Sequence, residues 1–113
     1  LADRAAIEAA VATVASVRLT DDVTNYVVDL VRGTRNNPLF ETGASPRSAA
    51  MISGAARAHA ALDGRDFVIP DDVKAIALPA LRHRAILSPA AEIEGRTPDE
   101  LISEIIEQTS APR

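Results

Sequence analysis

Residues 43–47 (GASPR) place an arginine where an anion could bind. Ser45 is a favourable residue just before a helix, and Pro46 suits the first helical position, where its missing N–H is not needed. Arg47 then falls in the first turn, beside the positive end of the helix dipole, where carboxylates are normally preferred. Free backbone N–H groups and a guanidinium together suit a phosphate. The five residues alone favour the simpler interpretation, a solvated surface arginine, and the rest of the chain changes that balance.

The sequence holds no other pattern typical of catalysis. None of the five glycines is followed by lysine, as a phosphate loop requires, and GxGxxG, GxSxG and HExxH are absent. There is no cysteine, and His59 and His83 have no metal-ligand spacing. His59 is expected to be a packed or boundary histidine, and His83 stands between Arg82 and Arg84 in a small basic knot. We therefore expect the chain alone to perform no reaction and to bind no metal.

Length and composition indicate one helical domain. The chain has 113 residues, of which 47% are hydrophobic and only 3% aromatic, and its formal charge is −4. The acidic balance argues against nucleic-acid binding. No apolar run approaches the roughly 20 residues that cross a membrane, and no signal peptide is visible. We expect a cytoplasmic protein without membrane insertion, and a fragment or processed product because the chain starts with leucine.

Helix signals dominate the chain, with three short extended pieces between them. Helices are expected to begin after Asp3, Thr20, Ser45, Ile69 and Thr97, the last with a capping box. Extended pieces are expected at residues 17–19, 67–69 and 86–87, and a loop over residues 36–43. The expected fold is mainly α, a helical bundle with two or three very short β-strands.

The second helix is the most clearly amphipathic. Its predicted buried face is Val23, Tyr26, Val27, Leu30 and Val31. The first helix carries an apolar stripe with the same periodicity, made by Ile7, Ala10, Val11 and Val14.

Four residues carry specific predictions about helix ends and packing. Gly33 is expected to help end the second helix, and Gly54 to mark a close contact between the third helix and another. Pro79 is expected to break the fourth helix and start a further turn. Ile69 cannot cap that helix, which is expected to weaken its start by about 1 kcal/mol. The acid pairs at residues 21–22 and 71–72 are explained by compensation of the helix dipole.

Four segments stand in an order that resembles one protein family. They are residues 26–35 (YVVDLVRGTR), 43–47 (GASPR), 64–74 (GRDFVIPDDVK) and 81–84 (LRHR). In this order and with these gaps they resemble the C-terminal lid domain of MoxR-type AAA+ ATPases, over nearly the whole chain. The resemblance implies that residues 1–113 form this lid, with a connector helix and short extended segment over 1–19 and a helical bundle over 20–113.

The resemblance also implies roles for particular residues. In that family the arginine of the GASPR segment is the sensor-two residue, which reaches the γ-phosphate of ATP bound between core and lid. This role falls to Arg47, as a catalytic residue. The residues implied in nucleotide binding are Ser45, Pro46 and Arg47. Those implied in lid–core or subunit contacts are Thr34, Arg35, His83 and Arg84.

The family's nucleotide-binding core is absent from this sequence. The phosphate loop, the acidic metal site and the arginine finger belong to that core. The resemblance therefore implies ATP and Mg²⁺ as cofactors of a full-length parent that is an ATP hydrolase, with neither bound to this chain alone. Isoleucine also stands at position 69, where relatives often have threonine.

Partners and function follow from the same resemblance. They are the chain's own AAA+ core, neighbouring subunits of a homo-hexamer, and a von Willebrand factor A domain protein. The lid would couple ATP binding and hydrolysis to chaperone-like remodelling of other proteins.

Two alternatives remain at this stage. One is a stand-alone helical protein-interaction module, which residues 67–73 support through a histone-fold character. The other is a lid from another AAA+ branch, such as the magnesium-chelatase group, which would keep the mechanism and change the client.

Overall fold

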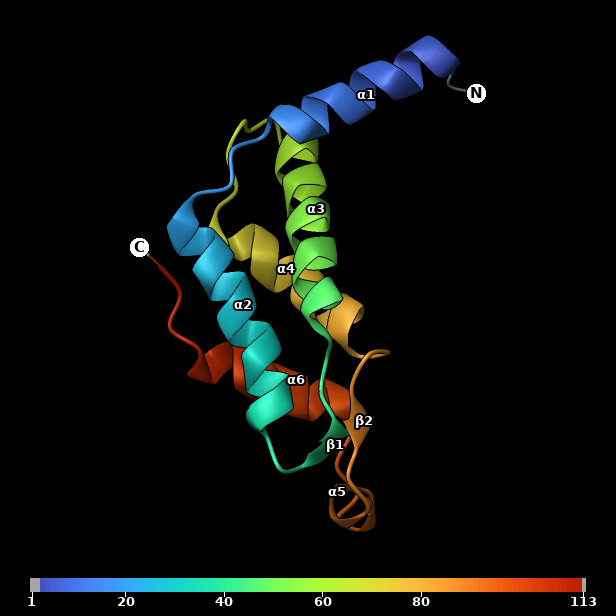
Figure 1. Ribbon diagram of the computed structural model, residues 1–113, viewed down its shortest axis with the longest axis vertical. Coiled ribbons are helices and arrows are strands. Elements are labelled where there is room, and N and C mark those ends of the chain that lie inside the picture. The colour runs from blue at the N-terminus through green and yellow to red at the C-terminus, as the bar shows by residue number, and fades with distance from the viewer. Residues whose placement is uncertain (1–2, 113) are drawn as a thin grey trace.

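The computed structural model describes residues 3–112, which form six helices and one two-stranded sheet (Figure 1). The helices are α1 (Arg4–Ser16), α2 (Asp21–Asn36), α3 (Pro46–Leu62), α4 (Pro70–Leu81), α5 (Pro89–Ile93) and α6 (Pro98–Gln108). The strands are β1 (Phe40–Thr42) and β2 (Ile86–Leu87). The mainly α bundle is confirmed, while the predicted outer limits, residues 1 and 113, lie outside the described part.

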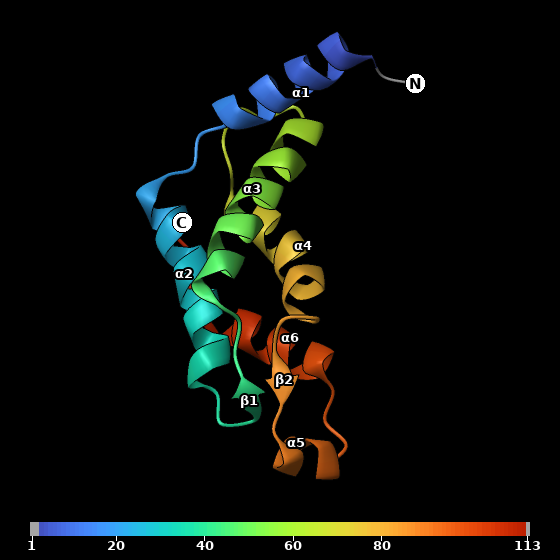
Figure 2. The same ribbon diagram turned by 45° about the vertical axis from the view of Figure 1, so that its right-hand side comes forward.

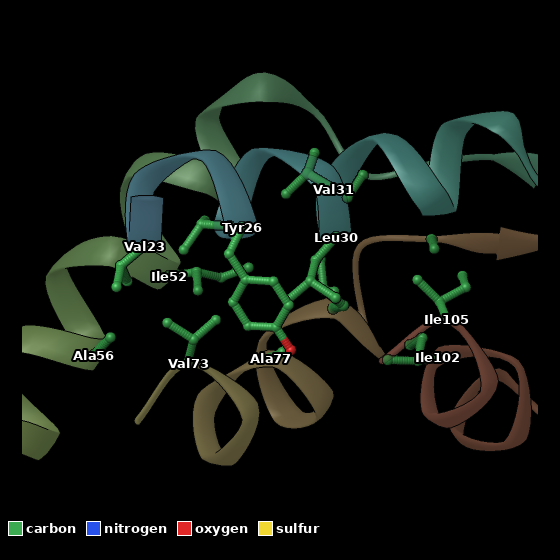
Figure 3. Packing of buried hydrophobic residues seen from close by; sticks show 14 of the residues in the cluster. Val23, Tyr26, Leu30, Val31, Ile52, Ala56, Val73, Ala77, Ile102 and Ile105 are labelled. Carbon is green, nitrogen blue, oxygen red and sulfur yellow. The ribbon is translucent and has the colours of Figure 1, made fainter. Parts of the chain in front are cut away.

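The core forms where α2 packs against α3, α4 and α6. Thr20 begins α2 by accepting a hydrogen bond from the Val23 N–H at 3.3 Å. The predicted apolar face of α2 is buried along its whole length, and the Tyr26 ring lies between α2 and α4 (Figure 3). The partner side chains labelled there include Ile52, Val73, Ala77 and Ile102. Burial of this continuous stripe stabilises the bundle.

Gly33 does not end α2, contrary to the sequence prediction. The helix runs on to Asn36, because Gly33 lies where α2 meets α6. A Cβ atom at Gly33 would stand 2.7 Å from Cγ2 of Ile105, which is closer than real contacts allow. The glycine therefore serves close packing of two helices inside the bundle.

Two predictions about α3 and α4 were also wrong. Gly54 lies on the exposed side of α3, and a Cβ atom there would meet nothing within 4 Å. Pro79 lies inside α4, which continues to Leu81. Pro79 is exposed and near the end of the helix, so its ring and its missing N–H disturb few backbone bonds.

The short strands connect segments that are distant in sequence. Strand β2 lies in a predicted extended piece, whereas β1 lies inside the predicted loop. The two strands pair antiparallel, and the register is irregular between the pairs Phe40–Leu87 and Thr42–Ile86. The extended pieces at 17–19 and 67–69 are confirmed, because their backbones pair. The Arg18 N–H donates to the Asp66 carbonyl at 2.8 Å, and the Arg18 carbonyl accepts from the Val68 N–H at 2.9 Å.

Helix α1 lies across one end of the elongated molecule, as Figures 1 and 2 show. Asp3 caps it by accepting from the Ala6 N–H at 2.8 Å. Its apolar stripe is not buried: Ile7 is 53% exposed and Val11 64%. Among residues 3–112, none of the helices has both the length and the apolar character needed to cross a membrane.

Candidate anion-binding site at the start of helix α3

Arg47 lies in the first turn of α3, as the sequence predicts. Ser45 is the residue before the helix and Pro46 its first residue. The Ser45 side chain makes no capping hydrogen bond, although serine is a favourable cap. Arg47 is exposed and makes no ion pair with an acid among residues 3–112. Pro46 has no N–H and the Ser48 N–H donates to the Ser45 carbonyl at 2.9 Å, so the first turn offers the Arg47 N–H beside an unpaired guanidinium, an arrangement that suits an anion.

Thr34 holds the loop that leads to Arg47. Its buried hydroxyl donates to the Val31 carbonyl at 2.7 Å and accepts from the Ala44 N–H at 2.9 Å. The sequence prediction placed Thr34 in a lid–core or subunit contact. Its burial corrects this, because a fully enclosed hydroxyl with two internal partners is not a contact surface. Thr34 instead positions residues 43–47 against α2.

Gly43 provides the second attachment of the same loop. A Cβ atom there would lie 2.5 Å from Cα and 2.6 Å from the backbone nitrogen of Arg35. Only glycine lets the loop pass this close to α2. Residues 43–47 are thus fixed to the last turns of α2 through Thr34 and Arg35.

A groove of about 240 Å³ lies between α2 and the start of α3. Its lining comprises Val28, Val31, Arg32, Arg35, Pro46 and Ala49. Arg32 and Arg35 are exposed and, like Arg47, have no ion-pair partner among the residues described. Two unpaired arginines, Arg32 and Arg35, thus line the groove, and Arg47 follows the lining residue Pro46, in a chain whose formal charge is −4. The groove thus combines an apolar floor with cationic groups that could receive a phosphorylated ligand.

The predicted contact residues His83 and Arg84 are not brought to this site. They follow α4 and line a different groove, formed by α3 and α4. The three basic residues 82–84 also differ in their surroundings, because Arg82 pairs with Asp99 of α6 at 3.2 Å, whereas His83 and Arg84 line the groove. Within residues 3–112 there is no cluster of His, Cys, Asp and Glu that could hold a metal ion.

Sequence reasoning missed an ionic network around the buried Asp72, at the other end of α3. Arg65 donates two hydrogen bonds to Asp72, at 2.6 and 2.7 Å, and His59 Nδ1 lies 2.7 Å from the same carboxylate. Hydrogen bonds from Arg65 hold the pKa of the buried Asp72 well below its usual range, and Asp72 in turn raises the pKa of Arg65. Asp72 is thus more than a dipole-compensating acid, which corrects the prediction.

Asp72 also explains how α4 begins without a capping residue. Its carboxylate accepts from the Ile69 N–H at 2.8 Å and so takes over part of the cap that Ile69 cannot provide. The signal in the sequence was an acid, Asp72, at the third position of the helix that begins at Pro70. Its pairing with Arg65 could not be predicted, because that pairing depends on how α3 and α4 meet.

The description "AAA lid domain" belongs to the family model that matches residues 32–105. The matched region includes the groove residues from Arg32 onward, the loop 43–47 and the ionic network. The chain belongs to the AAA lid domain family. The predicted resemblance to the lid of MoxR-family AAA+ ATPases is confirmed, since several relatives bear that name.

Three relatives each contain a region similar in sequence to this AAA lid domain. YeaC of Bacillus subtilis is 38% identical over 99 residues, which cover 88% of this chain and 31% of YeaC. The chaperone MoxR1 of Mycobacterium tuberculosis is 38% identical over 98 residues, covering 79% of this chain and 26% of that protein. Protein MoxR of Methylorubrum extorquens is 36% identical over 81 residues, which cover 71% of this chain and 24% of that protein.

A solved structure has the same fold. The crystal structure of a protein from Cytophaga hutchinsonii, proposed to be an ATPase, superposes with a TM-score of 0.83 at 28% identity. The match covers 90% of this lid domain and 34% of that chain. The lid thus spans about a quarter to a third of the length of the proteins it matches.

Proposed function

We propose that this lid closes over ATP bound by a nucleotide-binding core, and that Arg47 is the residue that contacts the terminal phosphate. The observation that carries the proposal is the unpaired, exposed arginine in the first turn of a helix whose start has no side-chain cap. A cation costs a few tenths of a kcal/mol at this position. A phosphate placed there by the core removes this cost, because it adds negative charge to the same turn.

Arg47 contributes electrostatically in this proposal. Its guanidinium donates hydrogen bonds to the terminal phosphate and stabilises negative charge as the phosphoryl group is transferred. When that phosphate leaves, Arg47 loses its partner and the lid is released. Thr34 and Gly43 keep Arg47 fixed relative to α2, so the loss is transmitted to the whole bundle rather than absorbed by a loose loop.

The groove beside Arg47 receives the rest of the nucleotide. Its apolar residues offer a surface for the base, while Arg32 and Arg35 attract phosphate oxygens. Ser45 and Pro46 set the start of the helix and so the position of Arg47. Mg²⁺, which neutralises phosphate charge when bound, would be held by the core.

The wider function is energy-dependent remodelling of other proteins. We propose that the full-length protein hydrolyses ATP and acts as a chaperone-like factor in a homo-hexameric ring with a von Willebrand factor A domain partner. Support comes from the names of two relatives, a chaperone and a protein proposed to be an ATPase. The lid contributes movement between neighbouring subunits.

Nucleotide discrimination in the full-length protein, with lid and core joined, tests the proposal. We expect Arg47→Ala to lower the affinity for ATP at least about tenfold while leaving that for ADP nearly unchanged, because only ATP carries the contacted phosphate. Arg47→Lys is the matched control, since it keeps the charge but loses the fork geometry, and an intermediate loss is expected. Equal affinities in all three proteins would contradict the proposal and favour the stand-alone interaction module.

A further inference from the structure

The tip of α5 is an exposed apolar residue between two acids. Ile93 is 87% exposed at the end of α5, and Glu92 and Glu94 flank it. Within residues 3–112 neither acid has an ion-pair partner. Figures 1 and 2 place α5 at the end of the molecule opposite to α1. The end of α5 therefore presents an apolar side chain between two unpaired acids.

The α5 tip, meaning residues 92–94, has a fixed backbone. The Glu94 N–H donates to the Ala90 carbonyl at 3.1 Å, and the Arg96 N–H donates to the Ala91 carbonyl at 3.0 Å. Gly95 between them has a φ of +75°, which closes the helix end. The tip therefore presents Ile93 and its two acids as a preformed knob.

The groove between α3 and α4 has the complementary character. It has a volume of about 380 Å³, an apolar floor and a basic edge. We call its apolar lining residues the floor, namely Met51, Ala55, Ile76, Pro79 and Ala80, and its two basic lining residues, His83 and Arg84, the edge. Both edge residues are exposed and have no acidic partner in the described part of the chain, whereas the adjacent Arg82 is already paired.

We propose that the α5 tip of one copy docks into the α3–α4 groove of another copy. Ile93 enters the apolar floor, and Glu92 and Glu94 meet the basic edge at His83 and Arg84. Charge complementarity is the reason to choose a second copy as the occupant: the acids Glu92 and Glu94 flank the exposed Ile93, and the basic residues His83 and Arg84 line part of the groove. The alternative groove between α1 and α3 contains one arginine, Arg57, and is otherwise nearly apolar.

The contact joins two different surfaces, so it is head-to-tail. Such an interface produces a ring when its rotation closes, and a filament otherwise. Only the closure into a ring rests on the proposed function; the contact itself does not involve Arg47 or nucleotide. A contact made by one short tip is small, so we expect weak association of the separate lid.

Disulfide trapping tests the contact, because the chain contains no cysteine of its own. In the Ile93→Cys/Ala80→Cys double variant, mild oxidation should produce a ladder of linked dimers, trimers and larger species. The matched control is Ile93→Cys/Ala58→Cys, which puts the second thiol in another groove between α1 and α3, one that contains no charged residue among those described. We expect the first pair to react at least about fivefold faster; equal rates, or faster reaction of the control, would overturn the proposal.

Charge exchange provides a second, independent arm. Adding Glu92→Lys and Glu94→Lys to the double-cysteine chain should abolish the ladder, and adding His83→Glu and Arg84→Glu as well should restore it. All four residues are exposed, so the fold should survive, which circular dichroism checks. A ladder that persists after the first change, or is not restored by the second, would overturn the inference. The assay contains no nucleotide, so its failure leaves the role of Arg47 untouched.

Discussion

The Thr34 hydroxyl accepts a hydrogen bond from the Ala44 N–H at 2.9 Å, joining the last turns of α2 to the loop that precedes Arg47. The same hydroxyl donates to the Val31 carbonyl, so it is fixed from both sides. One buried threonine thereby fixes the position of the residue to which we assign phosphate contact, and connects it to the most deeply packed helix of the lid.

Replacing Thr34 should therefore reduce the stability of the lid and loosen the loop that positions Arg47. Thr34→Val leaves the buried Ala44 N–H without a partner, so we expect the free energy of unfolding to fall by about 1–3 kcal/mol. Urea denaturation of the lid measures this. Thr34→Ser, which keeps the hydroxyl, should lose less, and Thr13→Val on the exposed face of α1 should change little. A Thr34→Val lid as stable as the parent would show that the hydrogen bond has no structural role.

The glycines of the lid should respond to alanine in opposite directions. At Gly43 the new methyl group would collide with the Arg35 backbone, so we expect loss of stability and a displaced loop. At Gly54 the space is open and the backbone helical, so Gly54→Ala should stabilise the lid by up to about 1 kcal/mol. Thermal unfolding of both variants tests the pair, and a stabilising Gly43→Ala would mean that the loop does not need its close approach to α2.

Asp72 should make the lid sensitive to acid. Because the folded state lowers the pKa of Asp72 below its ordinary value of 3.8, the ionised pair adds stability above about pH 4. That contribution is lost as the pH falls further toward the lowered pKa. Asp72→Asn should cost about 3 kcal/mol at neutral pH, since it leaves the arginine without its charge partner.

Urea denaturation at pH 7 and pH 3 measures this effect. The gap between the parent lid and Asp72→Asn should narrow at pH 3, because the parent then begins to lose the same interaction. Asp71→Asn is the control at the neighbouring, exposed position and should change the free energy of unfolding by less than about 0.5 kcal/mol. A gap independent of pH would exclude the ionised Asp72 as its source.

The sequence was sufficient for features that depend on local periodicity. The apolar face of α2 and its Thr20 cap follow from spacing and from one capping residue, and both were confirmed. The same holds for the start of α3 at Pro46 and the extended pieces around residues 18 and 68.

Features set by contacts between distant segments escaped prediction. Gly33 looks like a helix end, but its function is to admit Ile105 of α6. Strand β1 forms because β2 lies beside it, and no feature of residues 40–42 predicts that partner. Pro79 is tolerated because it lies on an exposed side near the end of α4.

The candidate site shows the same division. Arg47 and the segment 43–47 could be singled out from residue types, because the conflict between a cation and a helix start is local. That Arg32 and Arg35 share a groove with Pro46 depends on the packing of α2 against α3. The pairing of Arg65 with Asp72 depends on the turn between α3 and α4, and the acid alone could be explained by the helix dipole.

The most direct measurement is the rate of ATP hydrolysis by the full-length protein carrying Arg47→Ala, with Arg4→Ala on the exposed face of α1 as the control. We predict a rate about 10- to 100-fold below that of the parent, because a positioned cation at the transferred phosphate is lost. The melting temperature of the variant should be unchanged or slightly higher, since the cation no longer opposes the helix dipole. An Arg47→Ala protein that folds normally and hydrolyses ATP at the parental rate would contradict the account.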